Sequence, residues 1–184
     1  MNLLRKILRR QRGTRGEGGQ SLVEAAMAMP LLLAIGFNAI NFGYFWTMVM
    51  VLSTAPRMGA QYATQGGAVV QVPGDPTTTQ VSNLVYQNTT GEFGGTTANV
   101  QVRVCSKSQG VTGTGSSQVA QCTAFGPSLL TFGAVPADPE APLYVLDTVD
   151  VAYTFKPPIP GPVFGVVLPS NLTFHRATYM RSLF

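Results

Sequence analysis

From Ala25 to Pro56 the chain reads AAMAMPLLLAIGFNAINFGYFWTMVMVLSTAP, a run of 32 residues without a charged side chain. A helix needs about 20 apolar residues to cross the hydrocarbon core of a bilayer, which is roughly 30 Å thick. A cleaved secretory signal peptide is the alternative, but its apolar region is only about 7–15 residues long. The run therefore predicts a retained transmembrane helix that also emerges from the membrane.

Charged residues are distributed unevenly around this run. Residues 1–19 contain six basic residues and one acid, whereas residues 57–184 contain six bases and six acids. Basic residues accumulate on the cytoplasmic side of a membrane span, so the N-terminus is predicted to be cytoplasmic and the C-terminal part periplasmic. A basic segment can also bind nucleic acid. Its position beside a long apolar run favours a topology signal, so we expect the lipid bilayer, and no nucleic acid, as a partner.

Two prolines and two asparagines interrupt the apolar run. Pro30 lies inside the predicted helix, where proline removes a backbone hydrogen bond and is expected to produce a kink. Pro56 interrupts the pattern again, and the residues up to 65 can form a further helical segment after it. Asn38 and Asn41 are three residues apart and share a helix face. Inside a bilayer such side chains tend to contact a partner helix.

The residues before the apolar run read Gly18-Gly19-Gln20-Ser21-Leu22-Val23-Glu24. A carboxylate at the edge of a membrane is costly unless it has a partner. If the chain were cut after Gly19, the new amino group of Gln20 would supply a cation for Glu24. Alternatively, Glu24 only caps the start of the helix, where the helix dipole favours a negative charge.

Residues 18–65 resemble the TadE-like pilus-assembly family. That family has a basic leader, a glycine, the pair VE, an apolar run with an early proline, the pair FG and a closing AAR-GA-YA. The matching residues here are Gly19, Val23-Glu24, Pro30, Phe42-Gly43, Arg57, Gly59-Ala60 and Tyr62-Ala63. Residues 145–184 resemble the C-terminal strands of the family. The chain departs from the pattern at Ala25, where the family often has an aromatic residue, and at Pro56, which stands within AAR.

This resemblance implies a minor prepilin or pseudopilin of the tight-adherence (Flp, type IVb) pilus system. It implies that a prepilin peptidase cuts between Gly19 and Gln20, and that Glu24 takes part in subunit assembly. The implied partners are other pilus subunits, namely the major Flp pilin and minor pilins, and an inner-membrane assembly platform. A stand-alone bitopic membrane protein with a periplasmic ligand-binding domain is the alternative, and a membrane-anchored enzyme comes last.

The pattern of residues 66–184 predicts a small domain with one helix and four strands. Residues 77–88 form the expected helix, with Val81, Leu84 and Val85 on one face. Alternation of apolar and polar residues predicts strands at residues 98–105, 118–125, 144–155 and 172–180, and a polar glycine-containing loop at 106–117. The predicted fold class is α+β, with a long N-terminal transmembrane helix followed by a periplasmic antiparallel sheet. The expected segments are a cytoplasmic basic leader (1–19), a transmembrane and emerging helix (20–65) and a periplasmic domain (66–184).

Cys105 and Cys122 lie 17 residues apart on the strands that flank the predicted loop. An oxidising periplasm favours a disulfide between them, and two free buried thiols are the alternative. His175 is the only histidine, which is too few ligands for a typical metal site. No glycine loop carries a phosphate-binding lysine. We therefore expect no catalytic residues, no metal, no cofactor and no enzymatic activity.

Overall fold

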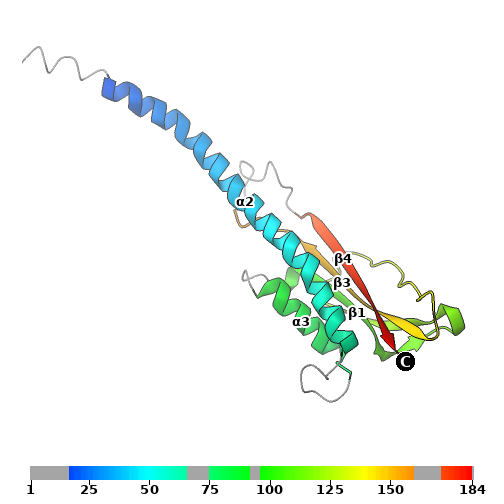
Figure 1. Cartoon of the computed structure of the whole chain (residues 1–184). Coiled ribbons are helices and arrows are strands. Elements are labelled where there is room, and N and C mark those ends of the chain that lie inside the picture. The colour runs from blue at the N-terminus through cyan, green and yellow to red at the C-terminus, as the bar shows by residue number, and fades with distance from the viewer. Residues whose placement is uncertain (1–16, 66–74, 92–95, 160–170, 184) are drawn as a thin grey trace, which may run out of the picture.

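The computed structural model describes residues 17–65, 75–91, 96–159 and 171–183. Over these residues, a long apolar helix is followed by a short helix and a small antiparallel sheet, so the predicted α+β fold is confirmed (Figure 1). The elements are α2 (Glu17–Gln65), α3 (Thr78–Thr90), β1 (Val100–Thr112), β2 (Val119–Phe125), β3 (Tyr144–Thr154) and β4 (Thr173–Leu183), with 3-10 turns η2 (Thr97–Asn99) and η3 (Gly115–Ser117).

The sheet has the strand order β2-β1-β3-β4, and every neighbouring pair is antiparallel. The predicted loop at residues 106–117 is wrong, because β1 continues through Thr112 and pairs again with β2. The register between the two strands shifts between Ser106 and Val111, and Gly110 lies within the shift with a φ of 112°. Glycine adopts this conformation without steric cost. Gly110 therefore lies in a bulge of a long hairpin, and the strand continues beyond it.

Helix α3 begins at a capping box. The Thr77 hydroxyl accepts from the Gln80 backbone N–H at 3.3 Å, and the Gln80 side chain accepts from the Thr77 backbone N–H at 2.9 Å. Val81 and Val85 are fully buried beneath the helix, whereas Leu84 is half-buried. The helix predicted at residues 77–88 is therefore present, with a buried face centred on the two valines.

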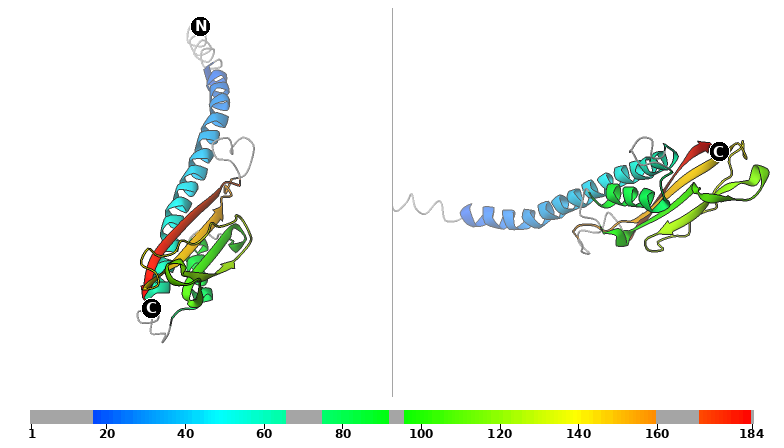
Figure 2. Two further views of the ribbon diagram at one scale, coloured as in Figure 1. Left: turned by 90° about the vertical axis from the view of Figure 1, so that its right-hand side faces the viewer. Right: turned by 90° about the horizontal axis from the view of Figure 1, so that it is seen from below.

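Both helices cover the same face of the sheet. Figure 2 shows that α2 lies on the side of β4 and α3 on the side of β1. The core between the layers is built from alternating side chains of β1 and β3 together with small and apolar residues of α2. Its fully buried members on the strand side are Val100, Val102, Val104, Val149, Val151 and Phe155.

Helix α2 is a single helix that contains both prolines. The interruption expected at Pro56 is absent, although proline cannot donate a hydrogen bond to the carbonyl of Leu52. Leu52, Ala55 and Pro56 are all buried, so packing against the rest of the protein holds this turn in helical conformation. Pro30 lies in the exposed half of the same helix, where the expected kink stays a prediction.

Candidate assembly surface

The N-terminal half of α2 extends beyond the sheet and exposes large apolar side chains (Figure 1). Leu22 is 70% exposed, Met27 77% and Leu31 65%. Between Gly19 and Gln65 the helix contains an 18-residue window with a mean hydropathy of 1.7, none of which is buried. A core helix of a soluble protein would bury such a window. By length and composition, α2 can cross a membrane.

The exposed half of α2 ends at Asn41, whose side chain is only 2% exposed. Its amide nitrogen donates to the carbonyl of Ile159 at 3.1 Å, and its amide oxygen accepts from the N–H of Ile159 at 3.2 Å. The amide of Asn41 thus binds the segment that follows β3 in its own chain, and the expected contact with a partner helix stays a prediction. Asn38 instead donates to the carbonyl of Ala34 in its own helix at 2.8 Å.

The position of Asn41 sets the length of the projecting half. The 22 residues from Gly19 to Ile40 span about 33 Å at 1.5 Å per residue. This matches the hydrocarbon core of a bilayer, which is roughly 30 Å thick. The outer part of the chain therefore begins to pack on α2 at the point where a membrane span of this helix would end.

Aromatic side chains fasten α2 to the sheet next to Asn41. The Phe45 ring packs edge-on against Phe155 and Phe174, with ring centroids 5.5 and 5.4 Å apart. The Tyr44 ring lies 5.8 Å from that of Phe155, and its hydroxyl lies 3.5 Å from the hydroxyl of Tyr153. Aromatic pairs in these geometries stabilise beyond their buried area. The cluster fixes the direction in which the free half of α2 leaves the sheet.

Small residues allow the C-terminal half of α2 to approach α3 and β3 closely. Ala55 and Ala60 have no exposed surface. A Cβ atom on Gly59 would lie 2.6 Å from the Cγ2 atom of Val85 and 3.4 Å from a methyl group of Val149. Gly59 and Ala60 belong to the segment that resembles the TadE-like pattern. The sequence alone did not assign them a role, and the structure places them in intramolecular packing.

The predicted processing and assembly residues lie together at the far end of α2. Gly19, Gln20 and Glu24 are exposed, and the Gln20 side-chain nitrogen donates to Glu24 Oε1 at 3.2 Å. A Cβ atom on Gly19 would meet no other atom within 4 Å. One helical turn thus brings Gln20 beside the carboxylate, while cleavage and subunit pairing stay predictions.

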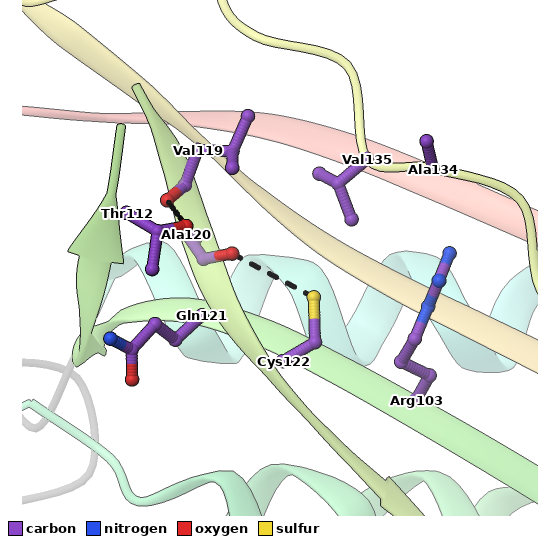
Figure 3. Close-up of a pocket in the computed structure, with 8 residues that line it drawn as sticks. All are labelled: Arg103, Thr112, Val119, Ala120, Gln121, Cys122, Ala134 and Val135. Carbon is purple, nitrogen blue, oxygen red and sulfur yellow. Dashed lines mark hydrogen bonds between the residues drawn. The ribbon is translucent and has the colours of Figure 1, made fainter. Parts of the chain in front are cut away.

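The two cysteines form the predicted disulfide. Cys105 of β1 and Cys122 of β2 are directly opposite each other in the register of the two strands. Beside them lies an open depression of about 490 Å³, lined by residues of β1, β2 and the segment after β2 (Figure 3). Figure 3 shows Arg103 and Val135 at one side of it. Among the described residues that line it, Arg103 alone is charged.

The face of the sheet away from the helices carries a buried carboxylate, Asp150. It is 1% exposed and accepts a hydrogen bond from Nε of Arg103 at 2.8 Å, while Nε2 of His175 lies 2.9 Å from its other oxygen. The Arg103 guanidinium also donates to the carbonyl of Gly133 at 2.7 Å and lies over the ring of Phe132. These contacts hold the segment after β2 against the sheet.

Arginine and aspartate face each other across β1 and β3 in this cluster. Opposite charges on facing strand positions could have suggested the pair from the sequence, but the prediction did not include it. Asp147 lies three residues before Asp150 and so on the opposite strand face. It does not share this cluster and accepts instead from the backbone N–H of Lys107 at 2.8 Å. In the described part of the chain, no three His, Cys, Asp or Glu side chains are grouped to hold a metal.

Asp147 is 1% exposed, and burial raises its pKa to about 6. The hydrogen bond from Lys107 opposes this shift, and the negative charge of Asp75 adds to it. Burial of this carboxyl therefore makes its charged form a cost to the stability of the folded protein.

Comparison with known proteins finds a family match in helix α2. Neither the curated proteins nor the solved structures contain a match to this chain. The family model that matches describes TadE-like proteins. This family is not an enzyme family and is connected with Tad pilus systems. The resemblance predicted for residues 145–184 lies outside the matched segment and stays a prediction. Residues 19–61 match the family model described as TadE-like protein, which confirms the predicted resemblance over the membrane-spanning candidate and the part of α2 that packs on the sheet.

Proposed function

We propose that this chain is a minor prepilin or pseudopilin of a tight-adherence, Flp (type IVb) pilus, which acts by packing α2 against the helices of other pilus subunits. The observation that carries the proposal is an apolar, unburied half-helix of bilayer length within a segment that matches the TadE-like family. In an aqueous environment, so large an apolar surface would be unfavourable. Lipid before assembly, and neighbouring subunits afterwards, would cover it.

In this proposal, residues 1–19 are a cytoplasmic leader, residues 20–40 cross the inner membrane, and the sheet lies in the periplasm. The basic leader supports this orientation, because basic residues favour the cytoplasmic side. The Cys105–Cys122 disulfide supports an oxidising compartment for the sheet. The expected partners are a prepilin peptidase, other pilus subunits and the assembly platform.

Glu24 gives this proposal its mechanism. After a cut between Gly19 and Gln20, the carboxylate would lie near the membrane surface with few polar groups around it. An unpaired charge there costs a few kcal/mol on insertion scales. The new amino group of Gln20, in the same chain or a neighbouring one, would offset that cost. Between subunits, this ion pair would select one axial register among several that helix packing alone leaves nearly equal.

The test separates processing from assembly. Glu24→Gln is expressed in a strain that lacks the native protein, and the mature N-terminus and surface pili are scored independently. We expect normal membrane insertion and cleavage, because removing a charge only eases insertion, but loss of pili and of co-purifying subunits. Glu140→Gln, which removes an exposed acid outside α2, is the matched control. Normal piliation with Glu24→Gln would show that this residue only caps the helix.

Cleavage itself is tested at Gly19. The open space around this residue means that Gly19→Leu should leave α2 intact and the leader attached. Gly36→Leu, at another open position of the same helix, should be processed normally. Mass spectrometry of the extracted wild-type protein should find Gln20 as the first residue. An N-terminus near Ala55 would instead indicate a secretory signal peptide and would overturn the proposal.

A further inference from the structure

Strand β4 forms the edge of the sheet on the side of α2 (Figure 2). The Phe155 N–H donates to the carbonyl of Leu172, which lies directly opposite, at 2.8 Å. This bond identifies which residues of β4 turn their backbone N–H and C=O groups toward β3. Backbone groups of successive residues alternate in direction. Those of Arg176 and Thr178 therefore point toward β3, and those of Ala177 point outward. Among the described residues, no strand pairs with this outer edge.

Two arginines flank the same edge. Met180 of β4 contacts the Thr64 hydroxyl of α2 at 3.9 Å. Arg57 precedes Thr64 by seven residues, or about two turns, and so lies on the same helix face. Arg176 precedes Met180 by four residues and lies on the same strand face. Both arginines are exposed, and neither has an ion-pair partner in the described part of the chain.

The helix provides an apolar surface beside these cations. Met50 and Trp46 precede Arg57 by seven and eleven residues, which places all three on one face of α2. Met50 and Trp46 are each 53% exposed. Thr64, which contacts Met180 of β4, belongs to the same helix face, so this face borders the free edge of the sheet. Alternating apolar and acidic side chains would match it.

We propose that the outer edge of β4 binds an extended acidic segment of a partner protein, which adds a fifth strand to the sheet. Backbone hydrogen bonds to β4 would supply affinity. Ion pairs with Arg57 and Arg176 would supply specificity and register. The proposal does not depend on the pilus function, because it requires only a partner on the same side of the membrane as the sheet.

Lipid headgroups do not fit this surface. Arg57 lies 17 residues beyond Ile40, or about 25 Å further along the helix, whereas the headgroup layer adds only about 5–8 Å to each side of the hydrocarbon core. The group that pairs with these arginines is therefore a carboxylate of a protein. Arginines on an edge strand can instead serve only to prevent unwanted pairing, and the experiment distinguishes this alternative.

A second copy of the chain fits poorly as the occupant. Antiparallel pairing of two β4 edges would point the two α2 helices in opposite directions, because β4 runs alongside α2 (Figure 1). Two chains anchored in one membrane cannot adopt that arrangement. The opposite edge strand, β2, reads VAQCTAF and has no acid to offer. The partner is thus a different protein.

The edge is tested by photo-crosslinking in the native host. A benzophenone amino acid replaces Tyr179, which is 48% exposed on β4, in the full-length membrane protein. The control places it at Gln121, an exposed position on the opposite edge. We expect a cross-link at residue 179 to a segment that mass spectrometry identifies as extended and acidic, and no such product at residue 121. The absence of a cross-link at residue 179, or a product with lipid or with a second copy, overturns the proposal.

Substitutions then test the mode of binding. Ala177→Pro removes one outward N–H, and prolines are tolerated on edge strands, while Ala177→Val keeps the N–H. Arg176→Glu reverses a charge, while Arg176→Lys keeps it. We expect Ala177→Pro and Arg176→Glu each to reduce the cross-linking yield at least about ten-fold, and the two controls to retain it. Changing the partner's acid to arginine should restore the yield with Arg176→Glu.

Formation of the Cys105–Cys122 disulfide is the check that each variant folds. If Ala177→Pro fails this check, Arg176→Glu alone still tests the proposal. A yield that Arg176→Glu leaves unchanged would show that the arginine only protects the edge, and would overturn the proposal.

Discussion

Asn41 and Ile159 are 118 residues apart in sequence and exchange two hydrogen bonds. This contact joins the helix to the segment that leaves the last core position of the sheet, Phe155. Before Asn41 most large apolar residues of α2 are exposed, whereas after it one face of the helix, which includes Met48 and Leu52, is buried in the core. The pair therefore marks the boundary between the two halves of α2. In the proposed membrane arrangement, this contact and the aromatic cluster beside it set the distance between the sheet and the membrane.

Asn41→Ala should loosen that boundary. The substitution removes both hydrogen bonds and leaves the Ile159 backbone without its partner, which typically costs about 1–3 kcal/mol. We expect faster hydrogen exchange at the Ile159 amide and a lower free energy of unfolding of the detergent-solubilised chain. Asn38→Ala, which removes only a bond within the helix, is the control. Equal exchange rates in the two variants would contradict the assigned role of Asn41.

Gly59→Ala should destabilise the protein although alanine is the better helix former. Alanine gains about 1 kcal/mol in helix propensity over glycine, but its Cβ would lie 2.6 Å from Val85 Cγ2. Overpacking of this kind costs about 1–3 kcal/mol. Gly43→Ala, in the same helix but with open space around the new atom, should be stabilising. Denaturant unfolding in detergent measures both, and a stabilised Gly59→Ala protein would show that α3 moves aside freely.

The disulfide should contribute to stability and resist alkylation. Without reduction, neither Cys105 nor Cys122 in protein taken from the cell envelope should react with a thiol reagent. Replacing both by alanine should lower the free energy of unfolding by about 3 kcal/mol in the chain-entropy model for a loop of this size. Denaturant unfolding of the double variant and of the unreduced wild-type protein measures this difference in the free energy of unfolding. Complete labelling of unreduced protein would contradict both the bond and the oxidising compartment.

Asp147 should make the protein less stable as pH rises from about 4 to about 6. Its pKa is raised to about 6 in the folded state and is about 3.9 in an unfolded chain. The folded state therefore binds the proton more tightly, and stability that is present below pH 4 is lost as pH passes the folded pKa.

Asp147→Asn should remove this decrease of the free energy of unfolding with rising pH. At pH 7 it should raise the free energy of unfolding by on the order of 1–2 kcal/mol. The new amide oxygen can still accept from the Lys107 N–H. Glu140→Gln, an exposed acid, is the control and should leave the decrease unchanged. Urea unfolding at pH 4 and pH 7 provides the comparison. A wild-type protein that gains stability over this range would contradict the prediction.

Local patterns in the sequence were sufficient for much of the fold. The uncharged run that begins at Ala25 predicted the long helix, because its length and composition can be read without knowing what surrounds it. Alternation of valines predicted β1 and β3, since side chains on a strand point to opposite faces in turn. The expected oxidising compartment likewise favoured a disulfide between Cys105 and Cys122, which lie on two predicted strands.

Only the tertiary structure decided where α2 leaves the sheet, why it continues through Pro56 and which groups surround Asp150. Each of these depends on residues far apart in sequence. Asn41 looked like a polar residue within a membrane span until Ile159 was placed beside it. Pro56 looked like an interruption between two helical segments until its burial was known. Local propensity reports what a segment favours alone, whereas packing adds free energies from distant segments that can exceed it.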